Sequence, residues 1–139
     1  MSVPAPLRKK SKLDVQVKAE QLVVHTVHIT SNPNVFDPKY KSVIDRVTDC
    51  AIGIGQDLWE ANGIRVTTAE DYARRRSLQT RAIGRLDALM YLMTVCRKTF
   101  GLRTKKYEYW VKLARETKAC ARAWRDSDAR RYGRLASGG

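Results

Sequence analysis

The sequence predicts an all-α protein, an antiparallel up-down-up-down four-helix bundle, and three observations support this prediction. Four segments repeat apolar residues at the i, i+3 and i+4 spacing of an amphipathic helix. No segment alternates apolar and polar residues for long enough to predict a strand. Three short connections join the four segments, and short connections place successive helices antiparallel. The 139 residues suffice for one domain with a single core.

The N-terminal part of the chain predicts a basic arm and then the first helix. Residues 1–12 are basic and contain two prolines, so we expect a disordered basic arm that either contacts phosphates or has no partner. The first helix is expected over residues 13–31, and the Ser-Asn-Pro-Asn segment 31–34 ends it. Its apolar stripe consists of Val15, Ala19, Leu22, Val23, Thr26, Val27 and Ile29.

The second helix has clear signals at both ends. Asp37 is a candidate N-cap with Pro38 in the first turn, and Asn62-Gly63, which tolerate a left-handed backbone, end the helix. The apolar stripe consists of Tyr40, Val43, Ile44, Val47, Ala51, Ile54, Leu58 and Ala61. The Gly53-Ile54-Gly55 segment lies inside this helical pattern without a preceding strand, so it predicts close helix packing and not a dinucleotide site.

The third helix is predicted to be long, over residues 69–100. Thr67 or Thr68 caps its start with Glu70 or Asp71 completing a capping box, and Gly101 ends it. Its core stripe consists of Leu78, Ala82, Leu86, Leu89, Met90, Met93 and Cys96.

The fourth helix begins at Thr104, and its apolar periodicity fades after Ser127. Its apolar arc consists of Trp110, Leu113, Thr117, Cys120, Ala121 and Trp124. The bundle is therefore assigned to residues 13–132, and residues 133–139 are expected to be a frayed tail.

Positive charge is concentrated in the second half of the chain. The net charge is +2 for residues 1–38, −1 for 39–70, +5 for 71–100 and +7 for 101–139. Such segregation favours a surface that binds a polyanion, because each neutralised phosphate releases condensed counterions. Nucleic acid, RNA or DNA, is therefore the expected partner.

The candidate nucleic-acid-binding residues share helix faces. Arg74, Arg81 and Arg85 recur at seven and four residues on the third helix, and further cations follow on the fourth. Arginine suits phosphate because its planar guanidinium donates two parallel hydrogen bonds. The alternative is a solvated basic face without a partner. The full set is Arg74, Arg75, Arg76, Arg81, Arg85, Lys112, Arg115, Lys118, Arg122 and Arg125.

Catalysis, metal binding and membrane insertion find little support. His25 and His28 are three residues apart, but no carboxylate or cysteine motif completes a metal set. The three cysteines, which form no CxxC pair, are expected in the core of a protein from a reducing compartment. With no nucleophile motif, signal peptide or membrane span, we expect a soluble, cytoplasmic protein that is not an enzyme and needs no cofactor or metal.

Several large apolar residues fall off the core stripes. A monomer would expose four of them to solvent: Ile52 and Trp59 on the second helix, and Tyr91 and Val95 on the third. Outward Trp and Tyr side chains are typical of subunit interfaces. We therefore expect these four residues to form an oligomer interface.

A set of short motifs resembles a known family. The set comprises Phe36-Asp37-Pro38-Lys39-Tyr40, Arg46, Glu60-Ala61-Asn62, Leu78-Gln79, Glu108-Tyr109-Trp110 with Leu113, and Ala123-Trp124-Arg125-x-Ser127-Asp128-x-x-Arg131-Tyr132. This pattern, across residues 13–132, is similar to that of small bacterial four-helix-bundle proteins, the accessory variability determinants of diversity-generating retroelements. These are close in type to proteins encoded within intervening sequences of 23S ribosomal RNA genes.

The resemblance implies a function beyond what composition predicts. Its members are noncatalytic, form homopentameric barrels of bundles, bind RNA and DNA, and associate with the reverse transcriptase that copies template RNA with errors during mutagenic retrohoming. The expected function is therefore a bacterial or phage-encoded accessory protein of such an element. Two alternatives stay open: an intervening-sequence type protein that binds RNA without a reverse transcriptase, and an oligomeric structural scaffold whose charge serves solubility.

Overall fold

The structure, a computed structural model, describes residues 5–136 of the chain and the side chains from residue 14 onward. Within these residues it consists of four α-helices and a short 3-10 helix, with no strand. The prediction of an all-α, four-helix fold is confirmed. The elements are α1 (Ala5–Thr30), η1 (Pro38–Tyr40), α2 (Lys41–Asn62), α3 (Ala69–Phe100) and α4 (Thr104–Ala136).

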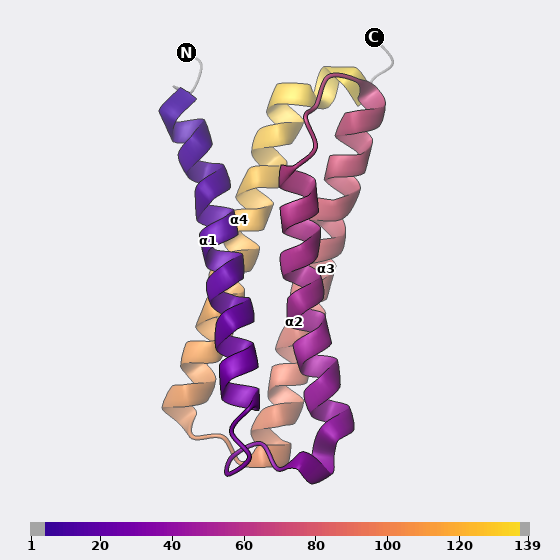
Figure 1. Cartoon of the computed structure of the whole chain (residues 1–139). Helices are drawn as coiled ribbons and strands as arrows, with labels where there is room; N and C mark the ends of the chain where they lie inside the picture. Colours follow the sequence, from indigo (N-terminus) through magenta and orange to yellow (C-terminus); the bar gives the residue numbers. More distant parts are fainter. Residues whose placement is uncertain (1–4, 137–139) are drawn as a thin grey trace.

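The four long helices lie side by side, and each packs on two neighbours (Figure 1). α2 packs on α1 and α3, and α4 also packs on α1 and α3. The α1–α2 and α3–α4 connections lie at one end of the molecule and the α2–α3 connection lies at the other (Figure 1). The apolar faces of all four helices therefore meet in one central core.

The helix starts follow the capping signals of the sequence. The Asp37 carboxylate accepts a hydrogen bond from the Lys39 N–H at 3.0 Å, with Pro38 as the first residue of η1. Thr68 and Asp71 form a reciprocal capping box in which each side chain accepts from the backbone N–H of the other. Hydrogen bonds from Thr67 and Thr68 lower the pKa of the Asp71 carboxyl. The predicted start of α3 is therefore confirmed. The start predicted for the second helix is corrected, because Asp37 and Pro38 begin the short helix η1, and α2 begins at Lys41 with no side-chain cap.

The two predicted glycine stops behave differently. Gly101 ends α3 in the left-handed region, with φ of 62° and ψ of 44°, as predicted. α2 ends at Asn62 as expected, but Gly63 is right-handed, with φ of −76°. The Gly63 N–H instead continues the helical pattern by bonding to the carbonyls of Glu60 and Trp59. The expectation of a left-handed end at this position is therefore corrected.

The core is closed at the end of the bundle near the α1–α2 connection by aromatic residues. Trp110 is completely buried, and its indole N–H donates to the Thr26 hydroxyl at 2.9 Å. Phe36, from the connection, packs 4.6 Å from the Phe100 ring and 6.2 Å from Trp110, measured between ring centroids. A buried indole N–H without an acceptor would be destabilising, so Thr26 makes this Trp position possible.

Two glycines allow close contacts of α2 with its neighbours. A Cβ atom at Gly55 would lie 3.0 Å from the Val23 side chain of α1, and one at Gly53 would lie 2.7 Å from the Arg85 guanidinium of α3. The interpretation of the Gly-Ile-Gly segment as a close-packing motif is therefore confirmed.

Both ends of the chain are more helical than predicted. Residues 5–12, expected to be part of a disordered arm, form the first two turns of α1. Residues 133–136, expected to fray, continue α4. Residues 1–4 and 137–139 lie outside the described part of the chain. The α1 correction has a local cause: residues 7–13 are mostly Leu, Arg and Lys, which favour helix.

Candidate nucleic-acid interface

The predicted basic residues of α3 and α4 divide into different environments. Four lie on one face of α4 beside α3, three lie at the α2–α3 boundary, and the remaining three are placed separately. We call Arg115, Lys118, Arg122 and Arg125 the α4 basic strip, and Arg74, Arg81 and Arg85 the α2–α3 arginine cluster.

The α4 basic strip follows the α3–α4 boundary. Its members are spaced by three, four and three residues, so they share one face over about 15 Å of helix. Lys118 contacts Asp87 of α3 at 2.6 Å, and Arg125 donates to the Thr80 hydroxyl at 3.3 Å. Arg115 and Arg122 are exposed and form no ion pair among residues 14–136. Within the strip, these two arginines are therefore the most available to an anion.

The α2–α3 arginine cluster is partly neutralised by a buried carboxylate. Asp57 of α2 is 3% exposed and accepts hydrogen bonds from Arg81 at 2.8 Å and from Arg85 at 3.1 Å. These hydrogen bonds raise the pKa of Arg81. Arg74 and Arg81 also line a hollow between α2 and α3 that contains the Glu60 side chain. Two carboxylates beside three arginines make this cluster a weaker anion site than the α4 basic strip.

Arg75 is not at the surface, which corrects its place in the predicted set. It is 1% exposed, and its guanidinium forms a bidentate ion pair with Asp128, through Nε and Nη2 at 2.7 Å each. Gln79 donates to the same carboxylate at 2.8 Å, and the guanidinium stacks 4.8 Å from the Trp124 ring centroid. Arg75 therefore joins α3 to α4 inside the bundle and is not available to phosphate.

The remaining two predicted cations are exposed but separate from the strip. Arg76 contacts the Tyr72 hydroxyl at 3.4 Å. Lys112 lies 3.8 Å from Glu116, which also pairs with Lys18 of α1. Because the shared carboxylate of Glu116 also contacts α1, Lys112 lies toward the α1 side of α4, away from the strip.

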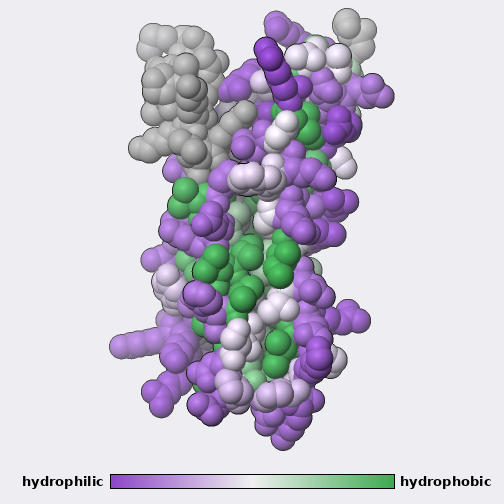
Figure 2. Space-filling model, in the orientation of Figure 1, coloured by the Kyte–Doolittle hydropathy of each residue, from purple (hydrophilic) through white to green (hydrophobic). Residues whose placement is uncertain are grey.

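The predicted interface residues form two patches, Ile52 with Trp59 on α2 and Tyr91 with Val95, four residues apart, on α3. Ile52 and Trp59 line an apolar groove between α1 and α2, together with Val24. Figure 2 shows hydrophobic side chains gathered along the middle of this face, over α1 and α2. Tyr91 is exposed and Val95 is half-buried, and both belong to α3, which packs on α2 and α4. Trp59, at 73% exposure, is the most exposed large apolar residue described.

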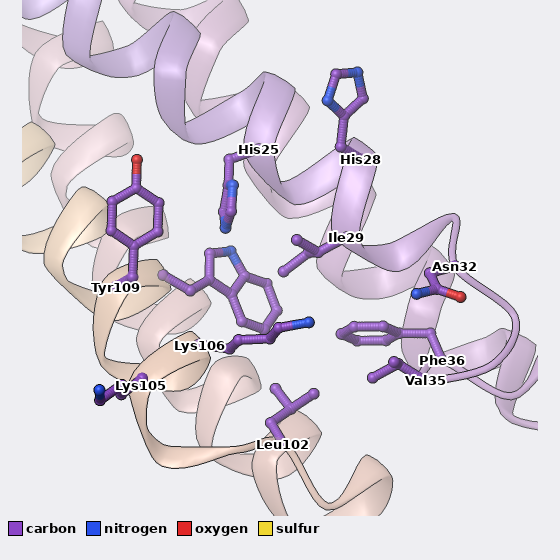
Figure 3. A pocket seen from close by; sticks show the side chains of 11 residues that line it. His25, His28, Ile29, Asn32, Val35, Phe36, Leu102, Lys105, Lys106 and Tyr109 are labelled. Carbon is purple, nitrogen blue, oxygen red and sulfur yellow. The ribbon is translucent and has the colours of Figure 1, made fainter.

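The histidines and cysteines of residues 14–136 do not gather into a metal-binding cluster. His25 and His28 point in different directions (Figure 3), and no cluster of three metal-ligating side chains exists among the described residues. Cys96 is buried, and burial raises the pKa of its thiol to about 12. Within the part of the chain that the structure describes, no helix has the length and apolar character needed to cross a membrane.

Sequence reasoning missed the two buried carboxylate networks. Asp57 was not identified as a partner of arginine, and Asp128, which belongs to a motif noted in the sequence, was not linked to Arg75. A signal was available for Arg75, because stepping back from Ala82 by four and three residues along the core stripe reaches Leu78 and then Arg75. A cation at a core position needs a buried counter-charge, so this spacing could have predicted an ion pair.

Comparison of the chain with protein-family models, with curated proteins and with solved structures finds no match.

Proposed function

We propose that this protein is a noncatalytic nucleic-acid-binding protein that uses the α4 basic strip to contact phosphates. The observation that supports this proposal is that Arg115 and Arg122 are exposed, lie seven residues apart on one face and form no ion pair with any described side chain, with Lys118 and Arg125 beside them. Contacts of this kind bind RNA and DNA without reading bases. The proposal therefore includes both nucleic acids.

We further propose that the bundle has up-down-up-down topology and assembles into a homo-oligomer, a pentamer by resemblance. The alternating placement of the three connections supports the topology. Two different apolar patches support a ring, because each subunit of a heterologous ring presents one surface to each neighbour. The patches are those of Ile52 with Trp59 and of Tyr91 with Val95.

The proposed biological partner is the reverse transcriptase of a diversity-generating retroelement. The motif pattern that ends in Ser127, Asp128, Arg131 and Tyr132 supports this partner. In this role the protein would hold the template RNA beside the enzyme during mutagenic cDNA synthesis. The burial of Asp128 and its ion pair with Arg75 give part of this motif a folding role.

The nucleic-acid proposal is tested with two matched variants. Arg115→Gln with Arg122→Gln removes two exposed arginines from the strip, and Arg46→Gln with Arg65→Gln removes two exposed arginines from the neutral half of the chain. Both double variants have the same net charge. We expect only the strip variant to lose at least about tenfold in affinity for a 20-nucleotide RNA or a 20-base-pair duplex. Equal losses in both variants would refute the strip as the interface.

The partner and assembly proposals have their own tests. Omitting the protein from a reaction that contains the reverse transcriptase and template RNA should abolish cDNA synthesis, and unchanged synthesis would refute the accessory role. Sedimentation velocity should give an oligomer that Trp59→Ser dissociates. A monomer at all concentrations would refute the assembly.

A further inference from the structure

A hollow of about 580 Å³ lies at the end of the bundle, between the C-terminal part of α1 and the first turns of α4 (Figure 3). The α1–α2 and α3–α4 connections complete its walls. Its apolar lining consists of Ile29, Val35, Phe36, Leu102, Tyr109 and Trp110. A hollow of this size with mainly apolar and aromatic walls is typical of a small-molecule site.

The floor of this hollow is held in place by the core. Trp110 and Phe36 are almost completely buried, and the Trp110 N–H is fixed by its hydrogen bond to Thr26. The Tyr109 ring packs edge-on against His25, with 5.0 Å between ring centroids. These contacts hold the walls of the hollow in place, so binding would require little ordering of the protein.

The charge of the hollow selects for anions. None of its lining residues is acidic, and two are lysines, Lys105 and Lys106. Figure 3 shows the Lys106 side chain lying across the hollow toward Phe36, whereas Lys105 points away from it. Neither lysine forms an ion pair among residues 14–136, and the first turn of α4 contains no acidic residue. An ammonium beside apolar walls favours a ligand that carries its own negative charge.

Two neutral polar groups can orient such a ligand. His25 is half-buried, and burial together with His28 lowers its pKa, so its imidazole is neutral at pH 7. The Asn32 side-chain oxygen accepts from the Asn34 N–H at 3.0 Å, which leaves the amide NH₂ to donate. Figure 3 shows His25 and Asn32 at opposite sides of the hollow.

We propose that this hollow is a binding site for an amphipathic anion, a compact aromatic or branched apolar body with one carboxylate or similar acidic group. The apolar body lies between Ile29, Phe36 and Leu102, and the acidic group pairs with Lys106. The α4 basic strip contributes nothing to this site, since no strip residue lines the hollow. The proposal is therefore independent of nucleic-acid binding.

The test compares two ligands of the same shape that differ in charge. Isothermal titration calorimetry on the full chain measures binding of 1-naphthoate and of 1-naphthalenemethanol, which lacks the carboxylate. We expect 1-naphthoate to bind about tenfold tighter, as one charge-assisted hydrogen bond in a partly enclosed site predicts. Equal affinities, or no binding of naphthoate, would overturn the proposal.

Variants locate the binding. Lys106→Gln should make the two ligands bind within about twofold of each other, because it removes the charge and keeps the apolar walls. Leu102→Trp should fill the hollow and abolish binding of both ligands, whereas Ala73→Trp, at an exposed position near the start of α3 and at the other end of the bundle, should change neither. Naphthoate binding that is unchanged in Lys106→Gln would overturn the proposal. Because Lys106 is exposed, this variant should fold, so it tests the proposal even if the Leu102→Trp protein does not fold. Loss of naphthoate binding in the Arg115→Gln, Arg122→Gln protein would instead place the ligand on the basic strip and also overturn it.

Discussion

Replacing Asp128 with alanine is expected to destabilise the bundle strongly, because it leaves the Arg75 charge buried without a counter-ion. Asp128 is 1% exposed, and its carboxylate accepts two hydrogen bonds from Arg75 at 2.7 Å and one from Gln79 at 2.8 Å. After the substitution, the Arg75 guanidinium keeps its contact with the Ile64 carbonyl, at 3.3 Å, and its stacking on Trp124. Neither contact can neutralise the charge.

The size of the effect follows from this burial. Removing one partner of a buried, hydrogen-bonded ion pair decreases the free energy of unfolding by about 3–5 kcal/mol. The free energy of unfolding of a natural domain is about 5–15 kcal/mol in total, so Asp128→Ala is expected to remove a large fraction of the stability. For a chain of this size the melting temperature should fall by roughly 10–20 °C.

The assay is urea denaturation followed by circular dichroism at 222 nm, at pH 7. The informative comparison is the double variant Arg75→Met, Asp128→Leu, which removes both charges and keeps apolar volume at both positions. We expect this variant to regain most of the stability lost in Asp128→Ala. A loss below about 1 kcal/mol in Asp128→Ala would refute the conclusion that Arg75 is buried and depends on this carboxylate.

Three further predictions concern stability and reactivity. Gly84 is exposed in the middle of α3, where a Cβ would meet no atom within 4 Å, so Gly84→Ala should raise the free energy of unfolding by about 0.5–1 kcal/mol in urea denaturation. Gly53→Ala should give no such gain, because its Cβ would displace Arg85. Burial lowers the pKa of His25, so the unfolded chain takes up a proton near pH 6.5 that the folded chain does not. The melting temperature should therefore fall as the pH decreases from about 7.5 to 5.5, and His25→Gln should reduce that slope; an unchanged slope would contradict the assignment. Burial raises the pKa of Cys96 to about 12, so a thiol reagent at pH 8 should label it only after unfolding, as mass spectrometry of labelled peptides would show.

The periodicity of apolar residues predicted the four helices because each helix buries one stripe against the same core. Both ends of α3 were predicted because their signals are local. Thr68 and Asp71 start the helix through side-chain hydrogen bonds, and Gly101 ends it through its left-handed backbone. The start of α1 was placed eight residues late. Prolines and lysines near the N-terminus predicted an arm, but residues 5–12 continue the helix.

The candidate site could be predicted only in part, because charge patterns do not say which cations have partners. Arg115 and Arg122 are exposed as expected, whereas Arg75 and Arg85 bind aspartates 53 and 28 residues away in the sequence. These pairs depend on the register between neighbouring helices, which apolar spacing alone does not determine. The hollow beside Lys106 could not be predicted for the same reason. Its walls come from the end of α1, the start of α4 and two connections, which only the folded arrangement brings together.

The central claim, that the basic half of the chain binds nucleic acid through phosphates, is tested most directly by the salt dependence of binding. Fluorescence anisotropy of a labelled 20-base-pair duplex and of a structured RNA would be measured from about 50 to 300 mM salt. The account predicts that log affinity falls linearly with log salt, with a duplex slope of roughly −2 to −4, as two to four phosphate contacts of the α4 basic strip require. A failure to bind even at the lowest salt, or an affinity independent of salt, would contradict it.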